Sequence, residues 1–101
     1  MKLLTEQIKR ILPALYSTEN TPCDEKKIIC RFFNPLGNQW WKIVEGSQEG
    51  EDWILFGQAD LGFGCAEWGY ISLNELEALD VGLGLGIERD IHFETSSELE
   101  A

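Results

Sequence analysis

Short runs of β-branched and aromatic residues follow one another through the middle of the chain, separated by brief polar connections that carry glycine, proline or asparagine. The runs cover residues 27–33, 39–45, 53–61 and 66–72. Such runs predict β-strands, and connections this short join strands that pair as hairpins. Because hairpin strands run antiparallel, the pattern predicts a mainly antiparallel sheet with helices on one face or at one end.

The stretch ADLGFGCAEWGYISLNELEAL, residues 59–79, links the last two of these strands and then enters a helix. Gly62 and Gly64 lie in the connection, where turns often need a positive φ that costs other residues steric strain. Ser72 stands three residues before Glu75, which is the spacing of a helix-capping box. The stretch therefore predicts a hairpin followed by a short helix, with core contacts from Leu73 and Leu76 and with Leu79 as a third candidate.

The two ends of the chain complete the predicted fold. In LTEQIKRIL the apolar residues recur at helical spacing, Thr5 suits the N-cap, and Pro13 ends the regular helix. Residues 87–93, IERDIHF, should form the last strand, and the acidic residues 94–101 should fray. We therefore predict one α+β domain over residues 1–101, with about five strands, an N-terminal helix and a short helix before the last strand.

Charge is distributed unevenly along the chain. The sequence carries 18 acidic and 8 basic residues, a net charge of −10. Residues 1–42 hold seven of the basic residues, whereas residues 43–101 hold fourteen acidic residues and Arg89 as their one basic residue. An acidic surface repels nucleic acid phosphates, attracts basic protein surfaces and keeps proteins dispersed. The charge therefore predicts no direct nucleic acid binding and, beyond solubility, a basic protein surface as partner.

The sequence offers little for metal or cofactor chemistry. Cys23, Cys30 and Cys65 are an odd number without a CxxC pair, and His92 is the single histidine, so neither a disulfide framework nor a zinc site is expected. The alternating glycines of residues 80–86 lack the strand–loop–helix context of a dinucleotide site. No apolar segment reaches the roughly 18 residues of a membrane span, and no signal peptide is recognisable. We predict a cytoplasmic protein with no cofactor, no metal and no membrane contact.

Three blocks of the sequence carry a family resemblance. They are LTEQIKRIL near the start, ADLGFGCAEWGYISLNELEAL in the middle and GLGLGIERDIHF towards the end. In order and spacing, over nearly the whole chain, they resemble the signature blocks of a small bacterial family, domain of unknown function family 2958. Trp68 departs from the smaller apolar residue that the family usually has there. The resemblance implies a compact domain of the kind found on plasmids and other mobile elements, and it implies no reaction.

The last predicted strand holds the strongest candidate for a binding site. Strand alternation places Arg89 on the core face, together with the apolar side chains of Ile87, Ile91 and Phe93. A buried guanidinium needs an acidic partner, for which Asp60 and Glu67 on neighbouring strands are candidates. The pair is either structural, which we favour, or part of a site for a carboxylate or phosphate ligand.

The opposite face of that strand would carry a polar row of Glu88, Asp90 and His92. Such a row can bind a cation or perform acid–base chemistry, yet a solvated strand face has the same pattern. Trp68 shares a strand face with Tyr70, and an exposed tryptophan among acids suits a protein interface. No residue is assigned as catalytic, and the candidate binding residues are Asp60, Glu67, Trp68, Glu88, Arg89, Asp90 and His92.

Composition and resemblance together favour a small acidic cytoplasmic protein of mobile-element type that binds proteins through an acidic face. One version of this hypothesis is mimicry of DNA, which would counter a host defence enzyme, because residues along a strand and phosphates along DNA recur at similar spacing. Two alternatives stay open. One is a structural accessory or ligand-binding domain with an anion site centred on Arg89. The other, which we rank last, is a small enzyme that uses Asp60, Arg89 and His92.

Overall fold

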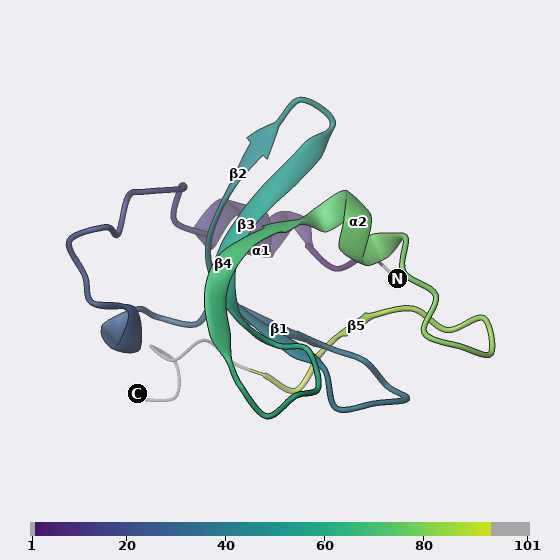
Figure 1. Ribbon diagram of the computed structural model, residues 1–101. Helices are drawn as coiled ribbons and strands as arrows, with labels where there is room; N and C mark the ends of the chain where they lie inside the picture. Colours follow the sequence, from purple (N-terminus) through teal and green to yellow (C-terminus); the bar gives the residue numbers. More distant parts are fainter. Residues whose placement is uncertain (1, 94–101) are drawn as a thin grey trace.

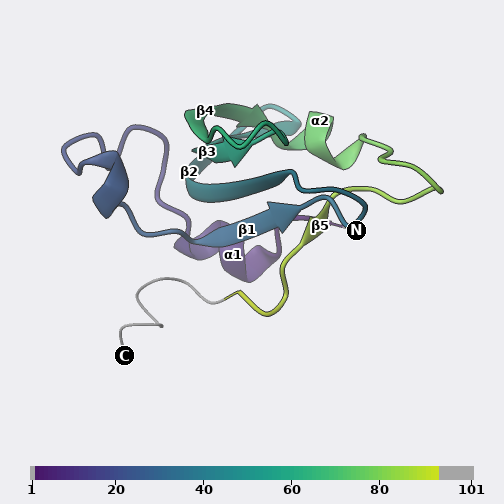
Figure 2. The same cartoon turned by 60° about the horizontal axis from the view of Figure 1, so that its bottom comes forward.

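The computed structural model describes residues 2–93, and its centre is one antiparallel β-sheet (Figure 1). The strands are β1 (Cys30–Phe33), β2 (Trp40–Glu49), β3 (Asp52–Asp60), β4 (Glu67–Ser72) and β5 (Glu88–Arg89). They lie in the order β4-β3-β2-β1-β5, and every neighbouring pair is antiparallel. Figure 2 shows the sheet twisted, with β4 and α2 at one end of the strand stack and β1 and β5 at the other. The predicted α+β class with about five strands is confirmed.

The predicted helices are present, and the structure adds a short 3-10 turn: the elements are α1 (Glu6–Ile11), η1 (Cys23–Glu25) and α2 (Leu73–Glu77). Thr5 is the N-cap of α1, and its Oγ1 accepts the Ile8 N–H at 3.0 Å. Leu12 has the extended backbone that a residue before proline prefers, so α1 ends there as Pro13 predicts. Within residues 2–93 no helix is long and apolar enough to span a membrane. The predicted fraying of residues 94–101 lies outside the described residues.

The hydrophobic core lies on one face of the sheet, called here the inner face. It includes the completely buried side chains of Phe32, Ile43 and Leu55. Burying a side chain of this size contributes about 1.5–3 kcal/mol. Leu12, just after α1, reaches this face beside Leu55, and α1 lies behind β2 and β3 in Figure 1. The opposite face is called the outer face.

The hairpin between β2 and β3 is longer than the sequence pattern predicts. Residues 46–52, GSQEGED, were expected to be a loop, but the ladder continues to the pair Glu49 and Asp52 and leaves only two residues in the turn. Gly50 permits so tight a turn because its φ is +61°. A hairpin end that projects into solvent can keep its backbone pairing without apolar side chains, so its composition resembles that of a loop.

The last strand is shorter than predicted. β5 ends at Arg89, because the Asp90 carboxylate accepts the His92 N–H at 3.0 Å and turns the chain. The alternation predicted for residues 87–93 is therefore wrong after Arg89. Ile87 is buried, whereas Ile91, predicted to face the core, is 69% exposed.

Candidate functional site

The candidate residues from the sequence fall into two groups at opposite edges of the sheet. Asp60, Glu67 and Trp68 lie on β3 and β4, whereas the other candidates, Glu88, Arg89, Asp90 and His92, lie on or just after β5. β2 and β1 separate the two groups. The predicted pairing of Arg89 with Asp60 or Glu67 is therefore wrong. The same separation keeps Asp60 away from Arg89 and His92, which the enzyme hypothesis requires to be neighbours.

Arg89 holds the beginning of the chain in place. It pairs with Phe32 across the ladder to β1, and its Nη1 donates to the backbone carbonyls of Lys2 at 2.9 Å and Leu3 at 3.1 Å. The Leu3 N–H in turn donates to Glu77 Oε2 at 2.9 Å. Leu3 is completely buried, so these contacts fix a core residue between two distant parts of the chain. These contacts of Arg89 with backbone carbonyls differ from the carboxylate pair that the sequence predicted for it.

The polar row predicted on the last strand does not form. Asp90 accepts from the His92 backbone and pairs with Arg31, whose Nη1 lies 3.4 Å from Asp90 Oδ2. Glu88 is half-buried in β5, and His92 is exposed on the turn that follows. Across residues 2–93 no group of three or more histidine, cysteine, aspartate or glutamate side chains suits a metal ion. These residues therefore form an ordinary ion pair and turn.

The three cysteines are free thiols, of which Cys30 is buried and Cys23 and Cys65 are exposed. Burial raises the pKa of Cys30 to about 12, against a smaller lowering by the charge of Arg89. A thiol with so high a pKa stays protonated and is a poor nucleophile. Cys30 therefore belongs to the core, and we assign it no chemistry.

Asp60 organises the turn that leads from β3 to β4. Its Oδ1 accepts the backbone N–H groups of Gly62, Phe63 and Gly64 at 2.8, 3.1 and 3.3 Å. Both glycines have the predicted positive φ, of +101° and +72°. The turn presents Phe63, which is 86% exposed, beside the start of β4. The carboxylate of Asp60 thus shapes one end of a surface rather than pairing with a distant cation.

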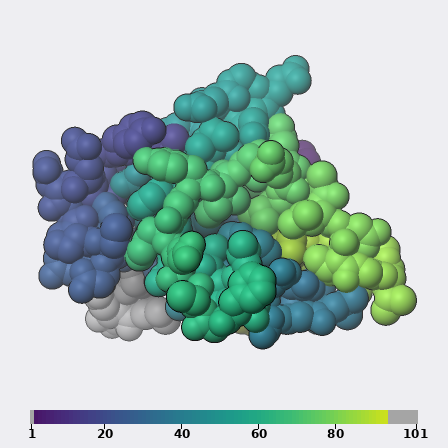
Figure 3. Space-filling model, viewed as in Figure 1, coloured from purple at the N-terminus to yellow at the C-terminus, as the bar shows by residue number. Residues whose placement is uncertain are grey.

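A groove of about 740 Å³ runs beside β4, from this turn to α2. Its inner-face floor is made of small residues, Gly57, Ala59 and Gly69. Apolar side chains border it, from Leu61 and Phe63 in the turn and from Leu76 and Leu79 in and after α2. Figure 3 shows β4, the turn before it and α2 on the same face of the molecule. The volume is within the range of binding pockets in proteins, about 300–1,000 Å³.

Two carboxylates mark the two ends of this groove. Glu67 is the first residue of β4, Glu75 lies on α2 beyond the other end of the strand, and both are exposed and line the groove. A strand of six residues spans roughly 17 Å at its usual rise, so the acids are well separated. An apolar floor between two acids suits a ligand whose apolar side chains are flanked by positive charges.

Trp68 belongs to an aromatic cluster on the outer face of the same strands. Its ring stacks on Phe56 with centroids 5.7 Å apart, and Tyr70 packs against Phe56 at 5.1 Å and against Tyr16 at 6.2 Å. Trp68 is half-buried rather than the exposed interface tryptophan that the sequence suggested. Trp68 and Tyr70 nevertheless line the groove too, together with the other four residues of β4.

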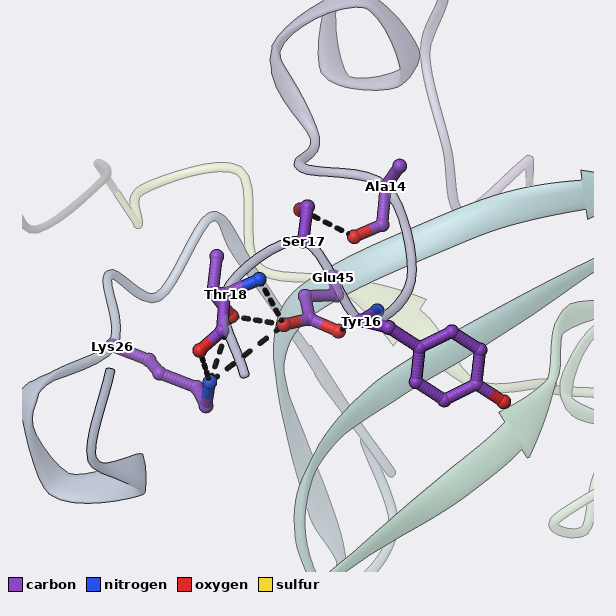
Figure 4. A network of polar contacts seen from close by, with 6 residues as sticks. All are labelled: Ala14, Tyr16, Ser17, Thr18, Lys26 and Glu45. Carbon is purple, nitrogen blue, oxygen red and sulfur yellow. Dashed lines mark hydrogen bonds and ion pairs between the residues drawn. The ribbon is translucent and has the colours of Figure 1, made fainter. Parts of the chain in front are cut away.

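The sequence analysis missed a buried carboxylate on the outer face, Glu45, which is 3% exposed (Figure 4). Glu45 Oε1 accepts the Tyr16 N–H at 2.9 Å, and Oε2 accepts the Thr18 N–H at 3.2 Å and the Thr18 hydroxyl. Lys26 Nζ lies 3.7 Å from Oε2 and donates to the Thr18 hydroxyl at 2.7 Å. The one sequence signal was a single acid at the end of the apolar run WWKIVE.

The environment of Glu45 keeps it ionised. Burial raises the pKa of its carboxyl, whereas the hydrogen bonds from Thr18 and Tyr16 and the charge of Lys26 lower it. Together the lowering effects exceed the effect of burial, so the net pKa shift is downward. Both oxygens are already engaged by protein groups, so no position is open for a substrate. The carboxylate fastens the segment between α1 and β1 onto the sheet at the β-bulge between Ile43 and Glu45.

Comparison with known proteins agrees with the family resemblance. The model of the family described as "Protein of unknown function (DUF2958)" matches residues 3–101. No curated protein and no solved structure matches the chain.

Proposed function

This chain belongs to the DUF2958 family of proteins of unknown function, and we propose that it is a small acidic module that binds another protein through the groove beside β4. The observation that carries the proposal is the combination of an apolar floor with the exposed carboxylates of Glu67 and Glu75 at its ends. The partner presents apolar side chains flanked by lysine or arginine. The cytoplasmic and mobile-element setting remains part of this proposal.

The charge of the molecule supports a protein partner over an anionic one. The net charge is −10, and the groove itself is bordered by acids, so phosphates and carboxylate metabolites are repelled from it. Opposite charge on the partner accelerates the encounter and excludes wrong partners, while the apolar floor provides burial. Direct nucleic acid binding is therefore not part of the proposed function.

DNA mimicry is supported less well by the geometry. A mimic needs rows of exposed acids along its strands, but Glu45 is buried and Asp60 is engaged by three backbone N–H groups. The outer face also carries the cations Arg31 and Lys42, which lie opposite each other on β1 and β2. We therefore place the recognition in the groove rather than in an extended acidic surface.

The test is selection of binders from a random peptide library displayed against the whole chain, followed by affinity measurements with the peptide that is enriched most. We expect peptides that combine apolar residues with lysine or arginine, and an affinity that falls as salt is added. The charge reversals Glu67→Lys and Glu75→Lys together should weaken binding by about tenfold or more.

The matched control reverses two exposed acids away from the groove, Glu19→Lys and Asp24→Lys, and so changes the net charge by the same amount. If the control weakens binding as much as the groove variant, the attraction is a property of net charge and the groove is not the site. Enrichment of peptides without basic residues would also contradict the proposal.

A further inference from the structure

We propose that β4 is an open edge to which an extended segment of the partner pairs as a sixth strand, with alternate side chains of that segment entering the groove. The inference rests on the proposed function and specifies how the partner is held. Main-chain hydrogen bonds along β4 supply general affinity, and the groove with its acidic ends selects apolar and basic side chains.

The lining of the groove points to the strand edge. All six consecutive residues of β4, Glu67–Ser72, line it. Successive side chains of a strand point to opposite faces, so a space on one face would contact only every second side chain. A space that contacts every residue of the strand follows its backbone edge.

That edge is unoccupied by other parts of the described chain. β4 is the first strand in the order of the sheet and pairs only with β3. Between residues 2 and 93, the backbone groups of residues 67–71 make no hydrogen bond outside that ladder. In an antiparallel edge strand every second residue points its N–H and C=O outward, which makes a template for another strand.

The edge has few of the usual features that prevent such pairing. Natural edge strands are protected by charged side chains, above all lysine, and by proline, bulges or shortness. β4 contains neither lysine nor proline, its one charge is Glu67 at its first residue, and its register with β3 is regular over all six residues. By contrast β5, at the other edge of the sheet, is only two residues long.

Gly69, in the middle of β4, is the residue that the fold alone does not explain. A Cβ atom at Gly69 would meet nothing within 4 Å, and its φ is not in the positive region. Gly57, opposite it on β3, is different, because a Cβ there would lie 2.1 Å from the Lys42 carbonyl oxygen. A glycine inside a strand weakens the strand, and it often marks a place where another backbone approaches closely. Gly69 is open to such an approach.

Charge selects the occupant of this edge. Glu67 begins β4 and Glu75 lies on α2 beyond the other end of the strand, so a segment with lysine or arginine towards its ends is complementary. A second copy of this chain would bring a net charge of −10 against another −10, which opposes pairing of β4 with itself. We therefore commit to a basic, extended segment of a different protein.

The experiment uses the most enriched library peptide, synthesised in two forms that are N-methylated at the odd or at the even backbone amides. N-methylation removes donors along one edge of the peptide and leaves its side chains unchanged. Strand addition predicts that one form loses about tenfold or more in affinity for the whole chain, while the other form keeps its affinity. If both forms bind like the parent peptide, or both fail equally, strand addition is wrong.

The variant Gly69→Val places a side chain on the inner side of β4 and should lower the affinity for the unmodified peptide by about tenfold, with the melting temperature unchanged or raised. Gln48→Val, at an exposed position of β2, is the matched control and should bind normally. Equal binding by both variants would overturn the inference.

The outcomes separate the two proposals. Peptides that depend on Glu67 and Glu75 but tolerate both N-methylated forms would retain the proposed function and exclude strand addition. Failure to enrich basic apolar peptides would remove both proposals. A concentration-dependent dimer of the chain that Gly69→Val abolishes, seen by sedimentation, would assign the edge to a second copy and overturn our choice of occupant.

Discussion

Ser72 and Asp52 meet where β4 passes into α2: the Ser72 hydroxyl donates to Asp52 Oδ2 across 2.5 Å. The same hydroxyl accepts the Glu75 N–H at 3.2 Å, and Asp52 Oδ1 accepts the Asn74 N–H at 2.9 Å. Two side chains therefore satisfy free N–H groups of the first turn, and one of them comes from β3. This arrangement fixes both where α2 begins and how it sits on the sheet, and so sets one wall of the groove.

Replacing Ser72 by alanine should destabilise the fold by about 1–3 kcal/mol. The change removes an N-cap, which is typically about 1 kcal/mol, and also a hydrogen bond to a carboxylate. Urea unfolding of the variant measures the difference. Ser17→Ala is the matched control, because the Ser17 hydroxyl bonds only to the exposed Ala14 carbonyl, and it should cost below about 0.5 kcal/mol. Equal costs for the two variants would mean that Ser72 does not cap α2.

Acid should weaken the fold through Asp52 and Glu45. The hydrogen bonds from Ser72 and Asn74 lower the pKa of the Asp52 carboxyl. The pKa of the Glu45 carboxyl is also lowered, because the effect of burial is outweighed by the hydrogen bonds to this carboxyl and by the charge of Lys26. A carboxyl with a lower pKa in the folded state contributes stability that is fully present above its unfolded pKa, about 4, and is lost as the pH falls through the folded value.

The measurement is the melting temperature between about pH 7 and pH 2, compared with Asp52→Asn. The variant should be less stable at neutral pH, and the difference should shrink as the pH falls below about 4. Protonation of the other acids changes the charge repulsion in the native protein and in Asp52→Asn alike, so this effect cancels when the two melting temperatures are compared. A difference that stays constant over this range would show that the folded pKa of Asp52 is ordinary.

Glu45 accepts hydrogen bonds from Tyr16 and Thr18 besides its ion pair with Lys26. Removing the charge of Glu45 and removing that of Lys26 should therefore lower the free energy of unfolding by different amounts. Glu45→Gln leaves the buried Lys26 ammonium without its counter-charge, which costs about 3–5 kcal/mol. Lys26→Met should cost less, because Glu45 keeps its hydrogen bonds from Tyr16 and Thr18. Chemical unfolding of the two single variants and the double variant gives the coupling. A larger cost for Lys26→Met would contradict this assignment of roles.

Alanine at Gly57 and at Gly69 should act in opposite directions. At Gly57 the new methyl would lie 2.1 Å from the Lys42 carbonyl oxygen, so backbone must move and the fold should lose several kcal/mol, as for the most damaging core changes. At Gly69 the methyl enters open space, and alanine should stabilise the strand by about 0.5–1 kcal/mol. Thermal melts distinguish the two, and similar losses at both positions would mean that the space beside Gly69 is filled.

The elements that the sequence predicted well are those whose cause is local. Thr5 and Ser72 are within a few residues of the N–H groups they cap, and the glycines at 62 and 64 lie within the turn they permit. The strand runs were found for the same reason, since each run carries its own pattern. The polar hairpin end at residues 46–52 was missed, because backbone pairing there does not require apolar side chains, and the last strand was predicted too long, because the turn at Asp90 ends it.

The features that were missed depend on contacts between distant segments. Glu45 is buried because residues 16–26 cover it, and no pattern around Glu45 shows this. Arg89 could not be matched to its acceptors, because they are backbone carbonyls more than eighty positions away. The groove required the order of the strands, since β4 is an edge only if nothing follows it in the sheet. Small residues such as Gly69 can be recognised as the floor of a groove only when the positions of the neighbouring strands are known.

The hydrogen bonds that hold Leu3 to Glu77 and Arg89 have a consequence for the synthesis of the chain. Leu3 is synthesised 74 residues before Glu77 and 86 residues before Arg89, an interval on the order of seconds at usual elongation rates. During that interval the hairpins can form while the leucines at the start of the chain stay in water. Leu3 and Leu4 are then available to chaperones, and the core is completed only once Arg89 has left the ribosome.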